Sequence, residues 1–137
     1  MDYSAVRERQ NNHKNQGIIL TKEGVKAMKT ENTKAQMRKG ILEYCILLVM
    51  SEKPQYAITI IEDLKKAKMI VVEGTLYPLL TRLKNEGLLT YKWEESTLGP
   101  PRKYYQLTEK GTEFLHELET SWFELTGAVD KIREKRA

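Results

Sequence analysis

The sequence predicts a mainly α-helical protein with one small β-hairpin, which is an α+β fold class. Several segments place apolar residues at the three- and four-residue spacing of helices, and two β-prone runs flank a Gly-Pro-Pro cluster. A third observation is the C-terminal segment, where apolar residues alternate spacings of three and four. The 137 residues suit one domain with appendages, and a net charge of +4 permits a polyanionic partner without proving one.

Residues 1–34 form a predicted N-terminal extension. They are polar apart from an apolar cluster at residues 18–20, so they bury little surface to offset the entropy cost of ordering. We therefore expect a flexible segment with at most a short helix from Thr21 to Met28. The Met-Lys-Thr triplet that begins at Met28 resembles a bacterial translation start, so the residues before it are a candidate artefact of start assignment.

The first helix of the ordered domain is expected from about Gln36 to Met50, where apolar residues keep helical spacing. Pro54 stops it, because proline lacks the N–H that a continuing helix needs. A second helix is predicted from about Ala57 to Lys66. The run KAKMIVVE that follows is β-prone.

A third helix is predicted in the segment EGTLYPLLTRLKNEG. One face is apolar, and the other carries hydroxyl, amide and cationic groups. With Thr75 as the N-cap, Pro78 falls at the third helical position, where no intrahelical hydrogen bond is lost. Gly87 suits the left-handed position that ends many helices. The apolar face consists of Leu76, Leu79, Leu80 and Leu83.

Two β-prone runs, LLTYKWEE and RKYYQLT, flank the breaker cluster STLGPP and predict a hairpin with a long exposed loop. A last helix follows, with Thr108 as its expected N-cap. Its apolar spacing is typical of a coiled-coil seam and predicts a C-terminal dimerisation helix over 109–137. The seam consists of Leu115, Leu118, Trp122, Leu125, Val129 and Ile132.

Three helices followed by a hairpin is the order of a winged helix-turn-helix domain, here over residues 35–108. In that arrangement the third helix enters the major groove of DNA, and the hairpin, called the wing, reaches the minor groove or its flanking phosphates. For each exposed polar residue the alternative is an ordinary solvated face. We expect DNA contacts from Thr75, Tyr77, Pro78, Thr81, Arg82 and Lys84 on the third helix, and from Lys92, Arg102 and Lys103 on the wing.

The segment GTLYPLLTRLKNEGLL, followed by GPPRKYYQLTEKG and preceded by GILEYCILLVMSEKPQYAITII, resembles the PadR family of bacterial transcriptional regulators. The similarity runs from about Arg38 to Gly111. It implies a winged-helix homodimer that usually represses transcription and often responds to small aromatic or phenolic compounds. Carried over residue by residue, the recognition-helix motif matches Thr75, Tyr77, Pro78 and Arg82, and the wing motif matches Gly99, Pro100, Arg102 and Lys103.

A homodimer is also expected from the cost of exposing the seam. Burying six apolar side chains is worth on the order of 9–18 kcal/mol per helix, against an association cost of roughly 4–15 kcal/mol. Packing of part of the seam on its own subunit is the alternative. A two-fold axis places two recognition helices roughly 34–36 Å apart, on an inverted-repeat operator. Trp122 is a candidate site for a flat aromatic effector, the alternative being that it packs the dimer core.

Other function classes find little support. The two histidines and Cys45 are not placed as a nucleophile and base, and neither metal-ligand spacing nor a phosphate-binding glycine loop is present, so we expect no catalysis, metal or cofactor. No apolar run is long enough to cross a membrane and the N-terminus lacks an apolar signal core, so a cytoplasmic location is expected. A winged helix that binds protein instead of DNA is the rival interpretation.

Overall fold

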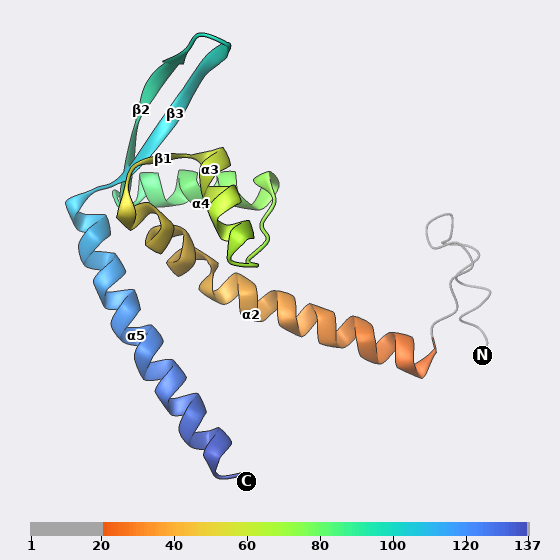
Figure 1. Ribbon diagram of the computed structural model, residues 1–137. Coiled ribbons are helices and arrows are strands. Elements are labelled where there is room, and N and C mark those ends of the chain that lie inside the picture. The colour runs from red at the N-terminus through yellow and green to blue at the C-terminus, as the bar shows by residue number, and fades with distance from the viewer. Residues whose placement is uncertain (1–20, 137) are drawn as a thin grey trace. The chain divides into compact units, whose positions relative to one another are not determined.

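A computed structural model describes residues 21–136 of the chain (Figure 1). The chain divides after Arg38 into two compact units. The apolar cluster at residues 18–20 lies outside the described residues.

Helix α2 (Lys22–Glu52) begins far earlier than the predicted start near Gln36. Its first turn is capped by Thr21, whose hydroxyl accepts a hydrogen bond from the Gly24 amide at 2.9 Å. All side chains from Lys26 to Gly40 are exposed, so tertiary burial does not hold this stretch. Good helix formers such as Ala, Lys, Glu, Gln and Met dominate it, and local propensity therefore explains the early start that apolar spacing did not predict.

The second unit packs the end of α2 against α3 (Ala57–Lys66) and α4 (Glu73–Asn85). Each helix turns one apolar stripe inward, which is what gives a small domain a single core. The stripe of α4 is buried as predicted, except that Leu79 is only partly buried. The fully buried large side chains are Ile46, Leu47, Ile60, Leu76, Leu80 and Leu83.

A three-stranded antiparallel sheet in the order β1–β3–β2 meets the helices at its base, and its hairpin projects away from them (Figure 1). The predicted hairpin is confirmed as β2 (Leu89–Ser96) and β3 (Gly99–Leu107). Strand β1 (Gln55–Tyr56), which pairs with Tyr105 and Tyr104, was not predicted, because two residues are too few to show a periodicity.

The β-prone run KAKMIVVE forms no strand; it connects α3 to α4 after Lys68, which has a left-handed φ of 69°. Only Val71 of its branched residues is buried, so the run lacks the two-sided burial that would favour a strand.

Helix α4 starts three residues before the predicted position. Its N-cap is Val72, not Thr75, and the amides of Thr75 and Leu76 both donate to the Val72 carbonyl at 3.0 Å. Pro78 therefore lies inside the helix, where it offers no N–H to the carbonyl of Gly74. The other end is as predicted, since Gly87 adopts a φ of 81°.

Helix α5 (Glu109–Glu134) leaves the sheet at the end opposite the tip of the hairpin (Figure 1). Thr108 is its N-cap as predicted, and the Thr108 hydroxyl accepts from the Gly111 amide at 2.9 Å. Among residues 21–136, no helix combines the length and the apolar character that a membrane crossing requires.

Candidate nucleic-acid interface

The outward face of α4 presents the side chains that the sequence analysis proposed for DNA. Thr75, Tyr77, Pro78, Thr81 and Lys84 are exposed, while the leucines on the other side anchor the helix in the core. A helix held in this way keeps its polar face fixed relative to the body, which an element that enters a DNA groove requires.

Arg82 is exposed on the same helix but is already paired within the protein. Its guanidinium lies 3.1 Å from a carboxylate oxygen of Glu43 on α2 and 3.5 Å from one of Glu86, one turn further along α4. The hydrogen bond and the charge of Glu43 raise the pKa of Arg82 above its usual value. Arg82 therefore braces α4 against α2, and a contact with DNA would require it to exchange these partners.

The cations of the wing rest on aromatic rings. Lys103 Nζ lies 4.5 Å from the ring centre of Tyr91 and 5.5 Å from that of Trp93. Arg102 lies 4.1 Å from the ring centre of Tyr56, on the neighbouring strand β1. Such cation–π contacts restrict a long side chain without neutralising it, so these charges are held in place and remain able to attract phosphate.

Lys92 and Lys84 also approach aromatic rings, but less closely. Lys92 Nζ lies 5.8 Å from the ring centre of Tyr104 and 3.9 Å from a carboxylate oxygen of Glu94, which offsets part of its charge. Lys84 Nζ lies 5.7 Å from the ring centre of Tyr91, so this residue of α4 and Lys103 of the wing share one ring.

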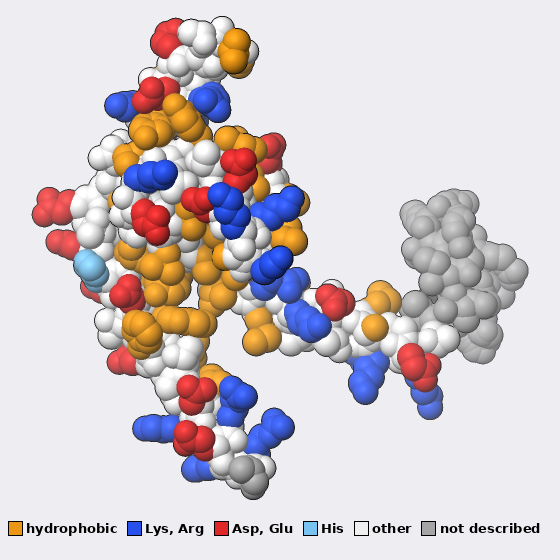
Figure 2. Space-filling view, in the orientation of Figure 1, with side chains coloured by type: hydrophobic (Ala, Val, Ile, Leu, Met, Phe, Trp, Pro, Cys, Tyr) orange, Lys and Arg blue, Asp and Glu red, His pale blue; other side chains and the backbone are white. Residues whose placement is uncertain are grey.

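A cleft of about 300 Å³ separates α4 from the wing. It brings together four predicted residues, Tyr77, Thr81, Arg102 and Lys103, and leaves out Thr75, Pro78, Arg82, Lys84 and Lys92. Figure 2 shows cationic side chains beside apolar ones below the tip of the hairpin. A concave surface with fixed positive charge is suited to a polyanionic backbone.

The same cleft contains residues that the sequence analysis did not single out: Tyr56, Ile58 and Trp93. Ile58 is 45% exposed and Trp93 61% exposed, so both present apolar surface to the cleft. Trp93 could have been proposed from the sequence, because a tryptophan in a predicted hairpin is a candidate contact residue. Tyr56 and Ile58 could not, because they reach the cleft only where β1 and α3 meet. Exposed apolar groups can contact sugars and base methyl groups.

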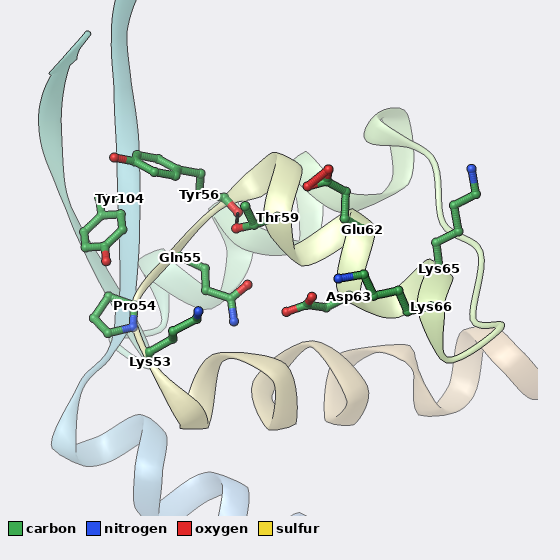
Figure 3. Close-up of a pocket in the computed structure, with 10 residues that line it drawn as sticks. All are labelled: Lys53, Pro54, Gln55, Tyr56, Thr59, Glu62, Asp63, Lys65, Lys66 and Tyr104. Carbon is green, nitrogen blue, oxygen red and sulfur yellow. Dashed lines mark hydrogen bonds between the residues drawn. The ribbon is translucent and has the colours of Figure 1, made fainter.

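A second hollow of about 640 Å³ lies beside β1 and α3 (Figure 3). Gln55 lines it and is only 3% exposed; its Nε2 donates to the Val49 carbonyl at 3.0 Å, and its Oε1 has no partner among the described residues. The charged side chains around it are of both signs, Lys53, Lys65 and Lys66 against Glu62 and Asp63. This mixture does not define a ligand class, unlike the cationic cleft.

The seam of α5 divides into two parts. Leu115 is buried and Leu118 partly buried in the core of the chain, so the first two seam residues pack within it, the alternative that the sequence left open. Trp122 is half-buried, with its ring centre 6.1 Å from that of Tyr44 on α2. The remaining three residues are exposed: Leu125 by 56%, Val129 by 45% and Ile132 by 70%.

Chemistry other than binding has little support in the described part of the chain. No group of three His, Cys, Asp or Glu side chains suitable for a metal occurs between residues 21 and 136. Cys45 is partly buried, and burial raises the pKa of its thiol, which disfavours the nucleophilic thiolate.

Comparison with known proteins places this geometry in a family. Residues 46–117 match the model of the transcriptional regulator PadR-like family. A PadR-like transcription factor from Bacteroides fragilis is 65% identical, with a TM-score of 0.64, covering 74% of this chain and 98% of that one.

Two further solved structures are similar. A PadR-like transcriptional regulator from Bacillus cereus is 41% identical, with a TM-score of 0.64 and coverage of 71% of this chain and 95% of that one. A PadR-family transcriptional regulator from Eggerthella lenta is 31% identical, with a TM-score of 0.70 and coverage of 79% and 95%. An uncharacterised protein from Lysinibacillus sphaericus is 28% identical over 99 residues, 70% of this chain and 91% of that protein.

Proposed function

Because the chain belongs to the PadR-like family of transcriptional regulators, we propose that it acts as a homodimeric repressor that a small aromatic ligand releases from an inverted-repeat operator. Family membership makes it a DNA-binding regulator and not an enzyme. We expect it to act in the cytoplasm, where bacterial DNA lies.

The observation that carries the DNA-binding mode is the cleft between α4 and the wing. Thr81 and Tyr77 line one wall, and Lys103, fixed over Tyr91, lines the other. In the proposed complex α4 lies in the major groove, with its exposed residues at the base edges. The wing cations Arg102, Lys103 and Lys92 contact the flanking phosphates. Thr75, Pro78 and Lys84 extend the contact along α4, and Arg82 contributes by holding the helix.

Salt-dependent binding to duplex DNA tests this mode. Each phosphate contact adds about −0.9 to the slope of log affinity against log salt, so Lys103→Met should make the slope shallower by about that amount. Lys131→Met on α5 removes the same charge away from the cleft and should leave the slope unchanged. Binding to no duplex at low salt would contradict the proposal and favour the rival function, a winged helix that recognises protein.

The exposed part of the seam supports a homodimer. Leu125, Val129 and Ile132 are separated by four and three residues, so they share one face of α5. Contact with the same face of a second copy would bury them. In that dimer two copies of α4 lie roughly 34–36 Å apart, which matches successive turns of the major groove. Sedimentation as a monomer at micromolar concentration would contradict this part.

Trp122 and Tyr44 support the proposal of an aromatic effector. Their rings face each other at a 40° angle at the point where α5 leaves the body, just before the exposed seam. A planar ligand that stacks on Trp122 in the dimer would contact residues of both copies. Quenching of Trp122 fluorescence by planar phenolic or cationic compounds, with loss of operator binding, tests it; no response across such a panel favours simple core packing.

A further inference from the structure

The first turn of α5 caps the C-terminal end of α4. Thr108 Oγ1 donates to the Gly87 carbonyl at 2.7 Å, and the Thr108 amide donates to the Leu88 carbonyl at 3.1 Å. Lys110 Nζ donates to the Glu86 carbonyl at 2.9 Å. Carbonyls at the end of a helix lack intrahelical partners and carry partial negative charge, so a lysine ammonium is well suited to bind them.

Gly111 packs closely against the segment that links α4 to the wing. A Cβ at Gly111 would lie 2.0 Å from the Leu88 carbonyl oxygen, far inside van der Waals contact. The backbone of α5 therefore rests directly on Leu88, three residues after the end of α4. A movement of α5 relative to the body must be accompanied by a movement of the end of α4, or must break these contacts.

The same end of α4 is tied to α2. Glu86 supplies its carbonyl to Lys110 and its carboxylate to Arg82, which also pairs with Glu43 of α2. Thus α2, α4 and α5 meet at the last turn of α4. The reading residues Tyr77 and Thr81 lie one to two turns before it on the same helix, and Trp122 lies three turns into α5.

We propose that Lys110 is a positioning residue that couples the orientation of α5 to that of α4, so that the state of the seam around Trp122 is transmitted to the DNA-reading face. This rests on the proposed function and adds the route of its regulation. Because coupling between two binding sites is reciprocal, operator binding at α4 must then change the environment of Trp122.

Fluorine NMR of the full chain labelled with 5-fluorotryptophan tests this coupling. The chain has two tryptophans, Trp93 in the cleft and Trp122 on α5, and Trp122→Phe assigns their signals. The DNA is a duplex selected from a random library by the unmodified protein. We expect both signals to shift on binding, Trp93 because it contacts or faces DNA and Trp122 because it is coupled.

Three variants distinguish the outcomes. Lys110→Met removes the donor and keeps most of the stem; we expect the Trp93 shift to persist, the Trp122 shift to disappear, and affinity to fall about three- to tenfold with an unchanged salt slope. Lys110→Arg keeps a donor and should retain the Trp122 shift. Lys131→Met, the same change later in α5, should behave as the unmodified protein.

Each failure has a separate signature. Failure of the selection to enrich any duplex that the unmodified protein binds means that the proposed function is wrong. A Trp93 shift without a Trp122 shift in the unmodified protein overturns the coupling. A full Trp122 shift in Lys110→Met overturns the role of Lys110 in it, because the contacts of Thr108 and Gly111 would then suffice. A shallower salt slope in Lys110→Met also overturns it, because that would make Lys110 a phosphate contact. Thermal midpoints of all variants check that each one is folded.

Discussion

Helices α4 and α5 carry similar apolar stripes, yet the two stripes differ in how far the chain buries them. The stripe of α4 is buried within its own chain, with Leu76, Leu80 and Leu83 fully inaccessible. The stripe of α5 is buried only at its start, and Ile132 near its end is 70% exposed. An apolar stripe thus predicts that a helix packs against other apolar side chains. The part of the stripe that stays exposed within one chain marks the surface that a second molecule could cover.

The difference in burial also suits the two helices to different roles. Because α4 is held on its apolar side, its polar side is free to serve as a rigid reading surface. Because α5 is held only at its first turns, the remainder extends from the body and can serve as a contact surface for a second copy. Substitutions in the two stripes should therefore affect different measurements.

The largest expected effect is on folding, from Leu80→Ala in α4. Deleting a fully buried leucine side chain leaves a cavity, and we expect the free energy of unfolding to fall by about 2–5 kcal/mol. The change Val129→Ala in α5 should cost the monomer less than about 1 kcal/mol, measured at a protein concentration below the dimer dissociation constant, because Val129 is 45% exposed within one chain. Urea denaturation measures both; equal losses would break the comparison.

The next effect is on assembly, from Leu125→Asp in the exposed seam. A carboxylate buried between two copies is unpaired, so we expect the dimer dissociation constant to rise at least about 100-fold, with helix content unchanged. Sedimentation equilibrium measures it. Thr120→Asp adds the same charge on the opposite side of α5 and should leave the dimer intact; if it dissociates the dimer equally, charge alone explains the effect.

A smaller effect should distinguish two cations on the exposed side of α4. Lys84→Met should weaken operator binding a few-fold and make the salt slope shallower by about 0.9. Arg82→Met should leave the slope unchanged and cost less than about 1 kcal/mol of stability, because its ion pairs with Glu43 and Glu86 are solvent-exposed. Titrations at several salt concentrations measure both slopes. A shallower salt slope for Arg82→Met would show instead that Arg82 contacts a DNA phosphate.

The smallest effect is a loss of folding stability at alkaline pH, and it arises from Tyr105 on β3. Burial raises the pKa of Tyr105 above its ordinary value of 10.0, so above pH 10 the folded state keeps a proton that the unfolded state has lost. The stability that this proton provides is complete below pH 10 and is lost as the pH rises toward the folded-state value. Tyr105→Phe should flatten this decline in denaturation measured between pH 9 and pH 11. If stability declines equally in Tyr105→Phe, the alkaline loss of stability arises from other tyrosines.

Much of the fold was predictable because its signals are local. The apolar stripe of α4, the hairpin around Gly-Pro-Pro, the left-handed Gly87 and the Thr108 cap each depend on residues within a few positions of one another. A helical spacing, a positive φ and a side-chain cap are properties of short segments. The PadR resemblance rested on these same segments.

The errors have equally physical causes. Helix α4 begins at Glu73 because Val72 caps it through its backbone alone, and that leaves no side-chain signature to predict. Strand β1 exists because residues 55 and 56 meet β3, some fifty positions later. The pairing of Arg82 with Glu43 joins two helices, so a wheel drawn for α4 alone could show that Arg82 is exposed but not that it has this partner.

By itself, the sequence determined which segments become helices and strands, where several of them stop, and that one helix offers both a leucine stripe and a polar face. Only the tertiary structure decided which apolar residues are covered and which cations are occupied. The seam divides between Leu118 and Leu125, Lys103 rests on Tyr91, and Lys110 closes the end of α4. The physical reason is that burial and pairing depend on distances through space, which chains fix only when remote segments pack.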